Sequence, residues 1–382
     1  MKMVTFGPVA PALVSGAVRD ALGALGGEPA KLVILYTPIG LDFQTLLRRV
    51  TALTKAPLVG ATTGGIAFTE RSFTTDGVVG AILAGDDVDV QVALARGLRA
   101  NLRGAVGTAA SMLKPLHPMV SPLVLVDAYA CDGEELIDAL VKTTPVHWRC
   151  FGGFAGDCQT YTGTKVLFND NAYDDAAVFA AISTKVQARM GVRHGFRITK
   201  GAREIRVTAT SGNVIQTLDG RPAADVYREE LERLGVRLVE DVNILSQLVC
   251  HSLSVKSPFG EGLKIRAPLA LGANGSISLG GSIAVDNLVR VVEATSDDLM
   301  ASAAALTAET TRQGGGGPVQ AQLIVDCGIR HLILGDRYEE QLRAFRGKAT
   351  HPVLGFASYG EIARYGGSIQ GFHNATAVTA LW

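Results

Sequence analysis

The chain has 382 residues, of which 47% are hydrophobic and 19% are charged. A chain of this length and composition can bury more than one hydrophobic core, so we expect two domains. Lys and Arg together number 36, as do Asp and Glu, and this balance argues against nucleic acid or an anionic membrane surface as a partner.

Neither a targeting segment nor a membrane span is expected. Glycines and prolines interrupt the first 20 residues before a continuous apolar segment can form. The longest uncharged run, residues 267–285, contains Pro268 and four glycines, which is typical of strands and turns rather than of a membrane helix. The five cysteines have no CxxC spacing, so we expect reduced thiols in a cytoplasmic protein.

A pattern of strand, helix, glycine turn and strand occurs three times along the chain. The first strands are 32–36, 123–127 and 323–325, the helices 43–53, 133–141 and 338–345, and the later strands 78–83, 176–182 and 376–381. The turns contain Gly60 and Gly64, Gly152 and Gly156, and Gly355 and Gly360, of which the last pair is one residue further apart. This self-similarity predicts repeated β-α-β-β modules.

Further elements follow each module. A strand at 88–94 is expected to end the first module, and helices are expected at 98–113, 223–234 and 296–311, with a strand at 247–255. We place a domain boundary near residue 210, which gives domains 1–210 and 211–382. The predicted class is α+β, with mixed sheets covered by helices in both domains.

The three glycine turns are the predicted ligand site, with the pocket at the junction of the two domains. Glycine lets a ligand approach the backbone closely, and a neighbouring polar side chain can fix the polar end of the ligand. The candidate binding residues are Thr62, Thr63, Gly64, Gly153, Gly156, Asp157, Arg330, Tyr359, Gly360, Glu361 and Asn374. Arg330 suits an anionic group such as a carboxylate. In the alternative interpretation, Asp157 and Glu361 satisfy turn amides and Arg330 pairs with one of them.

Several segments also carry a family resemblance. They are Gly60–Gly65, Gly152–Asp157, His194-Gly195, Leu218–Ala223, Asp326–Arg330, Gly355–Ile362 and Phe372–Thr376. In these segments and in their order the chain resembles the FIST family, bacterial signal-transduction proteins with an N-terminal and a C-terminal FIST domain. The resemblance spans nearly the whole chain. It departs at Asp326, where members of the family often have a serine after an aromatic residue.

The resemblance implies a sensory protein that binds a small ligand such as an amino acid. One branch of the family, with the same two-domain form, binds haem and reports nitric oxide to histidine kinases, so haem and a kinase are the implied cofactor and partner. Haem needs an axial ligand, for which the candidates are His194, His251, His351 and His373. Phe151, Phe154, Phe356 and Phe372 could line an apolar slot, and Arg330 could bind a propionate.

An enzyme is the competing interpretation. It would act on a small polar metabolite through Asp157, Glu361 or Cys327, but no GxSxG, HExxH or Rossmann GxGxxG signature is present. We therefore expect a non-enzymatic sensor, and the sequence leaves its oligomeric state open.

Overall fold

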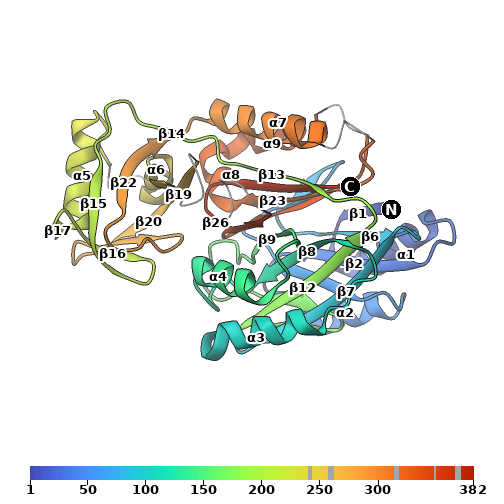
Figure 1. The fold of residues 1–382 in the computed structure, drawn as a ribbon. Coiled ribbons are helices and arrows are strands. Elements are labelled where there is room, and N and C mark those ends of the chain that lie inside the picture. Colours follow the sequence, from blue (N-terminus) through green and yellow to red (C-terminus); the bar gives the residue numbers. More distant parts are fainter. Residues whose placement is uncertain (240–242, 257–261, 314–317, 348–349, 366–370) are drawn as a thin grey trace.

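The computed structural model describes residues 1–239, 243–256, 262–313, 318–347, 350–365 and 371–382. Within these residues, three six-stranded sheets form a larger body, and a nine-stranded sheet within residues 197–293 forms a smaller lobe beside it (Figure 1). Among the helices described, none combines the length and the apolar composition needed to cross a membrane.

The first module shows how each sheet of the body is built. Strand β2 (Ala30–Thr37) leads into helix α2 (Phe43–Thr51), and β3 (Leu58–Thr62) returns parallel to β2. Strand β6 (Val78–Ala84) lies antiparallel on the other side of β2. Strand β2 is buried from Leu32 to Thr37, as expected for a strand that is covered on both faces.

The second and third modules repeat this arrangement. The second consists of β8 (Met119–Val126), α4 (Gly133–Thr143), β9 (Cys150–Phe154) and β12 (Ala176–Thr184). The third consists of β23 (Gln322–Cys327), α8 (Gly328–Leu334), η3 (Gly335–Arg337), α9 (Tyr338–Arg346), β24 (Val353–Ser358) and β27 (Ala377–Leu381). In both, the first two strands are parallel and the last is antiparallel to the first. The predicted β-α-β-β repeat is confirmed.

Each module also has a leading strand and helix. These are β1 (Lys2–Val9), η1 (Pro11–Leu13) and α1 (Val14–Ala24); β7 (Val88–Arg96) and α3 (Leu98–Met112); and β13 (Arg189–Arg193) and α7 (Ser296–Arg312). Each leading strand pairs with the last strand of the module that follows it, as β7 does with β12. The predicted strand at 88–94 therefore belongs to the second sheet, and assigning it to the first module was wrong.

Short hairpins link the three sheets into a ring. The hairpin of β4 (Ala67–Thr69) and β5 (Phe73–Thr74) leaves the first sheet and joins β24 of the third. The hairpin of β25 (Glu361–Arg364) and β26 (Gly371–His373) leaves the third sheet and joins β9 of the second. The hairpin of β10 (Val166–Phe168) and β11 (Asn171–Tyr173) leaves the second sheet and joins β3 of the first. All three sheets consequently have the same strand order. The three glycine turns, which we call the glycine corners, lie where the hairpins cross between sheets.

The main core lies between the inner faces of the three sheets. It contains residues from all of them, and Tyr36 of the first sheet stacks on Phe356 of the third with ring centroids 4.3 Å apart. Helices cover the outer faces: α1 and α2 on the first sheet, α3 and α4 on the second, and α7 and α9 on the third. The predicted α+β class, with mixed sheets covered by helices, is confirmed.

The lobe is inserted into the third module, between β13 and α7. Its elements are β14 (Arg197–Ile198), β15 (Ile205–Ser211), β16 (Val214–Leu218), β17 (Arg221–Pro222), α5 (Ala223–Arg233), α6 (Ile244–Cys250), β18 (Leu253–Lys256), β19 (Leu263–Arg266), β20 (Pro268–Leu271), β21 (Ile277–Leu279) and β22 (Leu288–Glu293). The predicted strand at 247–255 was wrong in its first half, where α6 lies. A short apolar run fits a buried strand and a buried helix equally well.

The predicted boundary at residue 210 lies within β15. Strands β23, β24 and β27, from beyond residue 210, share a sheet with β4, β5 and β13, from before it. The domains 1–210 and 211–382 divide the sequence and remain a prediction. In space, the molecule divides into the body and the lobe.

Candidate functional site

Backbone hydrogen bonds join the three glycine corners. The Gly64 amide donates to the Ala357 carbonyl (2.6 Å), the Gly156 amide to Thr62 (2.9 Å) and the Tyr359 amide to Phe154 (3.0 Å). In the third corner, Tyr359 and not Gly360 therefore occupies the position that Gly64 and Gly156 occupy in the other two corners. This explains why Gly355 and Gly360 are one residue further apart than the paired glycines of the other corners.

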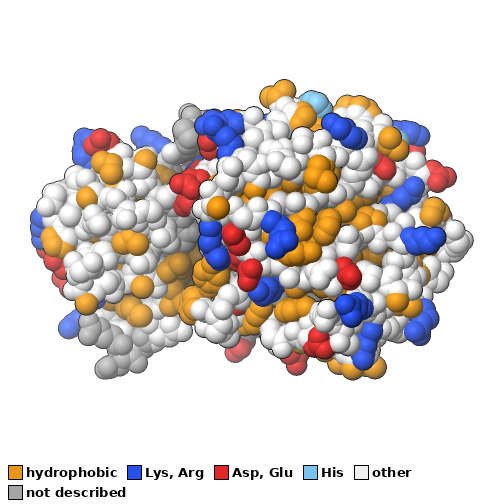
Figure 2. Space-filling view, turned by 90° about the horizontal axis from the view of Figure 1, so that it is seen from below, with side chains coloured by type: hydrophobic (Ala, Val, Ile, Leu, Met, Phe, Trp, Pro, Cys, Tyr) orange, Lys and Arg blue, Asp and Glu red, His pale blue; other side chains and the backbone are white. Residues whose placement is uncertain are grey.

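A cavity of about 530 Å³ lies between the corners and the lobe. Its walls in the body come from the loop that follows β8, the start of α8 and the corner residues Gly64, Ser358 and Tyr359. The lobe contributes Asn213, Leu245, Leu269, Leu279 and neighbouring glycines. Figure 2 shows hydrophobic side chains in the hollow between the lobe and the body. The position matches the general rule that ligands of sheets with parallel strands bind beyond the carboxyl ends of those strands.

Two of the predicted binding residues, Gly64 and Tyr359, line this cavity. The others lie in the protein behind its walls. Thr62 pairs with Lys165 through both its backbone amide and its hydroxyl, and Thr63 is buried. Gly153 and Gly156 have no room for a side chain, since a Cβ on Gly156 would lie 2.3 Å from the Gly64 nitrogen. The corners therefore form the floor of the site, and other segments supply most of its walls.

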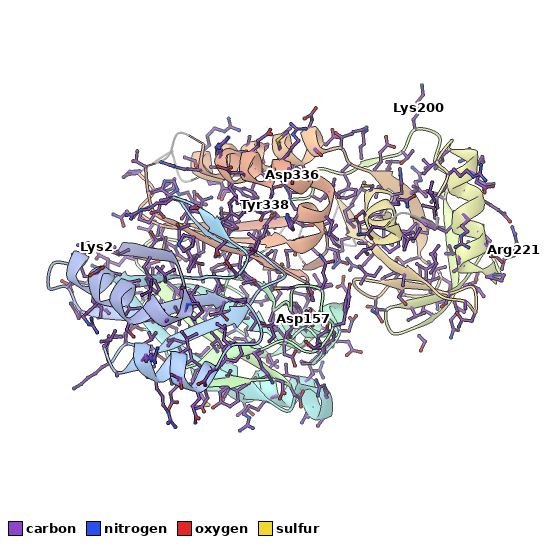
Figure 3. The ribbon with its side chains drawn as sticks, turned by 180° about the vertical axis from the view of Figure 1, so that it is seen from behind. Lys2, Asp157, Lys200, Arg221, Asp336 and Tyr338 are labelled. Carbon is purple, nitrogen blue, oxygen red and sulfur yellow. The ribbon has the colours of Figure 1, made fainter. Side chains whose placement is uncertain are left out.

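Asp157 holds the loop after β9 in place. Its carboxylate accepts hydrogen bonds from the hydroxyls of Tyr359 (2.7 Å) and Tyr129 (3.3 Å) and from the amides of Thr162 (2.8 Å) and Gly163 (3.2 Å). Burial alone would raise the pKa of Asp157, but these hydrogen bonds outweigh it and lower the pKa. Figure 3 labels Asp157 at the end of the body that faces the lobe.

Glu361 is a buried acid beneath the cavity. Its Oε1 lies 2.6 Å from the Ser358 hydroxyl, and the Thr376 amide donates to its Oε2 (3.2 Å). Burial raises the pKa of Glu361 well above its usual range, against these hydrogen bonds, and so favours the neutral carboxyl. Asn374 is nearby and donates to the Gly280 carbonyl of the lobe (3.2 Å).

Arg330 does not line the cavity. Its Nε lies 2.9 Å from Asp326 Oδ1, and its guanidinium also donates to Gln341 and to the carbonyls of Leu299 and His194. The arginine is fully buried and its donors are engaged within the protein. From the sequence, Arg330 was expected either to bind a ligand or to pair with Asp157 or Glu361. It pairs internally, but with Asp326.

The candidate haem-binding histidines lie in four separate places. His194 follows β13, His251 ends α6 in the lobe, His351 precedes β24 at the end of the strand remote from the corners, and His373 lies opposite Glu361 in the β25–β26 pair. None is among the described residues that line the cavity. Burial, with help from Arg330, lowers the pKa of His194 to about 4, and its Nδ1 accepts a hydrogen bond from the Phe196 amide (2.9 Å). Within the described residues, the lining of this cavity does not match the predicted haem site, since it offers neither a histidine as axial ligand nor a Lys or Arg for the propionates.

The thiols near the cavity are not activated. Cys131 and Cys327 both line it, but burial raises the pKa of Cys131 to about 12 and that of Cys327 well above its usual range. A nucleophilic cysteine needs the opposite shift. Among the described residues, no group of three or more His, Cys, Asp or Glu side chains could hold a metal ion.

Most of the lining residues were not predicted from the sequence. Residues 128–133 form the loop after the first strand of the second module, and Gln159 and Tyr161 belong to the loop that Asp157 holds. The repeat itself indicated the first of these loops, because a loop after the first strand of a parallel pair lies at the ligand-binding edge. The contribution from the lobe had no such signal.

Family models assign both parts of the chain. The FIST N domain matches residues 31–221 and the FIST C domain matches residues 223–364. No curated protein matches the chain. Together the two matches extend over nearly all of the sequence, so the chain belongs to the FIST family of signal-transduction sensory proteins, with one FIST N and one FIST C domain.

Proposed function

We propose that this protein is a sensor that binds a small molecule in the cavity between the body and the lobe and reports its binding to a signalling partner such as a histidine kinase. FIST domains are sensory domains that bind small ligands and signal to partners. The observation that carries the proposal is the cavity of about 530 Å³ with walls from both the body and the lobe. A ligand there touches both parts and so favours one relative arrangement of them.

Contacts beside the cavity connect the two parts. Glu134, in the first turn of α4, pairs with Lys264 (2.9 Å) and with Arg266 of the lobe. Asp132 accepts a hydrogen bond from the Ser282 hydroxyl (3.0 Å), also of the lobe. Burial lowers the pKa of Lys264, although Glu134 opposes the shift. A change of the lobe's position on ligand binding would alter these partly buried ion pairs, and would thereby transmit the binding event from the cavity to the contacts between the lobe and the body.

The finer alternatives are less well supported by the site. The predicted axial histidines lie away from the cavity, so we do not propose haem or nitric oxide as its ligand. A nucleophile at Cys327 or Glu361 would have to be ionised, whereas burial raises the pKa of both. Asp157 is ionised, but its hydrogen bonds hold the loop.

The test compares two tryptophan variants. Leu269 lines the cavity and is 36% exposed, whereas Leu288, in the same lobe, is 41% exposed and does not line it. Wild type, Leu269→Trp and Leu288→Trp are screened against a panel of small metabolites by thermal denaturation. A ligand of the cavity should raise the Tm of the wild type and of Leu288→Trp, and Leu269→Trp should lose most of the shift because the indole fills the site. A ligand that shifts all three proteins equally would place the binding site elsewhere.

A further inference from the structure

We propose that the ligand of this cavity is an apolar molecule with a neutral hydrogen-bonding end and no anionic group. This inference rests on the proposed function, because it names the chemical class that the same cavity accepts. It separates the site from one built for the carboxylate of an amino acid or for an organic phosphate.

The charges of the lining carry the first step. No Lys, Arg or His is among the described residues that form the cavity, and Asp132 is their one charged side chain. The Asp132 carboxylate caps α4 through the amides of Glu134 (2.8 Å) and Glu135 (3.3 Å) and binds Ser282 as well. An anion entering this cavity would lose its hydration and meet a carboxylate instead of a cation.

The cations behind the walls are already paired. Arg266 lies against Phe372 and Gly281, both of which line the cavity, but its guanidinium binds Glu134 and the Ser282 carbonyl (3.0 Å). Arg330, on the other side, is held by Asp326. An anion would therefore have to compete with Glu134 or Asp326 for the cation, and that carboxylate would lose one of its partners.

Two neutral polar side chains of the lining come from one loop of the body. Gln159 and Tyr161 line the cavity, and within the described part of the chain neither side chain makes a hydrogen bond. Their backbones have φ angles of 63° and 54°, a left-handed conformation that is costly for such residues and that the Asp157 hydrogen bonds maintain. Their amide and phenol groups are exposed, and they suit a hydroxyl, carbonyl or amide group of a ligand.

Apolar side chains form much of the remaining wall. They are Phe154 and Phe372 of the body, Ile329 and Leu332 of α8, and Leu245, Leu269 and Leu279 of the lobe. Such a surface favours an aromatic ring or a branched aliphatic chain. A ligand with such an apolar part and a neutral polar end can pack against the apolar side chains and form hydrogen bonds with Gln159 or Tyr161.

Matched probes test the inference. Indole is compared with indole-3-carboxylate, and p-cresol with 4-hydroxybenzoate, by calorimetric titration of the full-length protein at neutral pH. The neutral member of each pair should bind at least about tenfold more tightly than its carboxylate. Leu269→Lys adds a cation at the cavity and should narrow this difference, whereas Leu288→Lys, outside the cavity, should leave it unchanged.

The outcomes separate this inference from the proposed function. Tighter binding of the carboxylates to the wild type, lost in Leu269→Trp, would overturn the charge inference and leave the cavity as the ligand site. The charge inference would also be overturned, with the cavity still the ligand site, if no neutral probe binds but a charged metabolite of the screening panel binds in the cavity. Binding that Leu269→Trp does not weaken would contradict the proposed site itself, and the absence of binding by every probe and panel member would contradict both.

Discussion

Two carboxylates of the glycine corners differ in charge although the sequence presents them alike. Asp157 accepts four hydrogen bonds, including two from backbone amides, and remains ionised. Glu361 is enclosed in the core of the body with the Ser358 hydroxyl, the Cys327 thiol and the Thr376 amide around it, and its pKa is raised by burial. The first acid organises a loop, whereas the second is a neutral group under the site floor.

Glu361→Gln should remove a pH dependence of stability. The folded state keeps a proton on Glu361 that the unfolded chain releases above about pH 4. The unfolding free energy of the wild type should therefore lose about 1.4 kcal/mol per pH unit through this group as the pH rises from there toward the folded-state pKa. Glutamine has no proton to release, so the unfolding free energy of the variant should rise relative to that of the wild type over this range. Denaturant titrations from acidic to neutral pH measure the difference.

Glu232→Gln, at an exposed position in the last turn of α5, is the control for removing one carboxyl group. It should not change the slope of stability with pH to a comparable extent. Parallel pH profiles for the wild type and Glu361→Gln would show that Glu361 is ionised in the folded protein, contrary to the assignment above.

At the residue scale, the sequence indicated which polar groups cluster at the corners but not their roles. Gly64 and Tyr359 line the cavity, as expected of binding residues. Arg330 pairs with Asp326 because the end of β23 and the start of α8 bring them together in the core. Whether a charged side chain such as Arg330 faces a ligand or pairs with a carboxylate of the protein depends on how distant segments pack around it. That packing cannot be seen in the linear sequence.

At the scale of elements, the glycine corners are required by the exchange of hairpins between sheets. Each corner passes so close to the next that their backbones are in hydrogen-bond contact. The repeat and helices such as α2 and α4, expected at 43–53 and 133–141, follow local patterns and were predicted. The exchange of β4–β5, β10–β11 and β25–β26 was not, because short strands of this length carry no signal for which distant strand they join.

Gly156→Ala tests the close approach of the corners. The added Cβ would meet the Gly64 nitrogen at 2.3 Å and its Cα at 2.4 Å, and neither can move without shifting a buried strand end. We expect a loss of unfolding free energy of about 3 kcal/mol, at the upper end of the usual cost of overpacking. Urea denaturation measures it. The matched change Gly23→Ala in α1, where no atom lies within 4 Å of the new Cβ, should be neutral or stabilising by up to about 1 kcal/mol. Equal effects at both glycines would contradict the tight crossing of the corners.

At the scale of the whole molecule, the ligand site is a property of the body and the lobe together. The three modules place the carboxyl ends of their parallel strands near one another, and the inserted lobe closes the space beyond two of them. The sequence analysis expected a pocket at the junction of two domains. The lobe walls could not be located from the sequence, since Leu269 and Leu279 come from strands whose place beside the body depends on contacts such as Glu134 with Arg266.

The central claim, that the ligand bridges the body and the lobe, can be measured directly by hydrogen–deuterium exchange. The full-length protein is compared with and without the tightest-binding member of the probe set, and Leu269→Trp serves as the control that should show no ligand effect. Exchange should slow in the body at residues 128–133 and 159–161 and in the lobe at residues 279–281, because the ligand contacts both sides of the cavity. Protection confined to the body, or to segments away from these walls, would contradict the account.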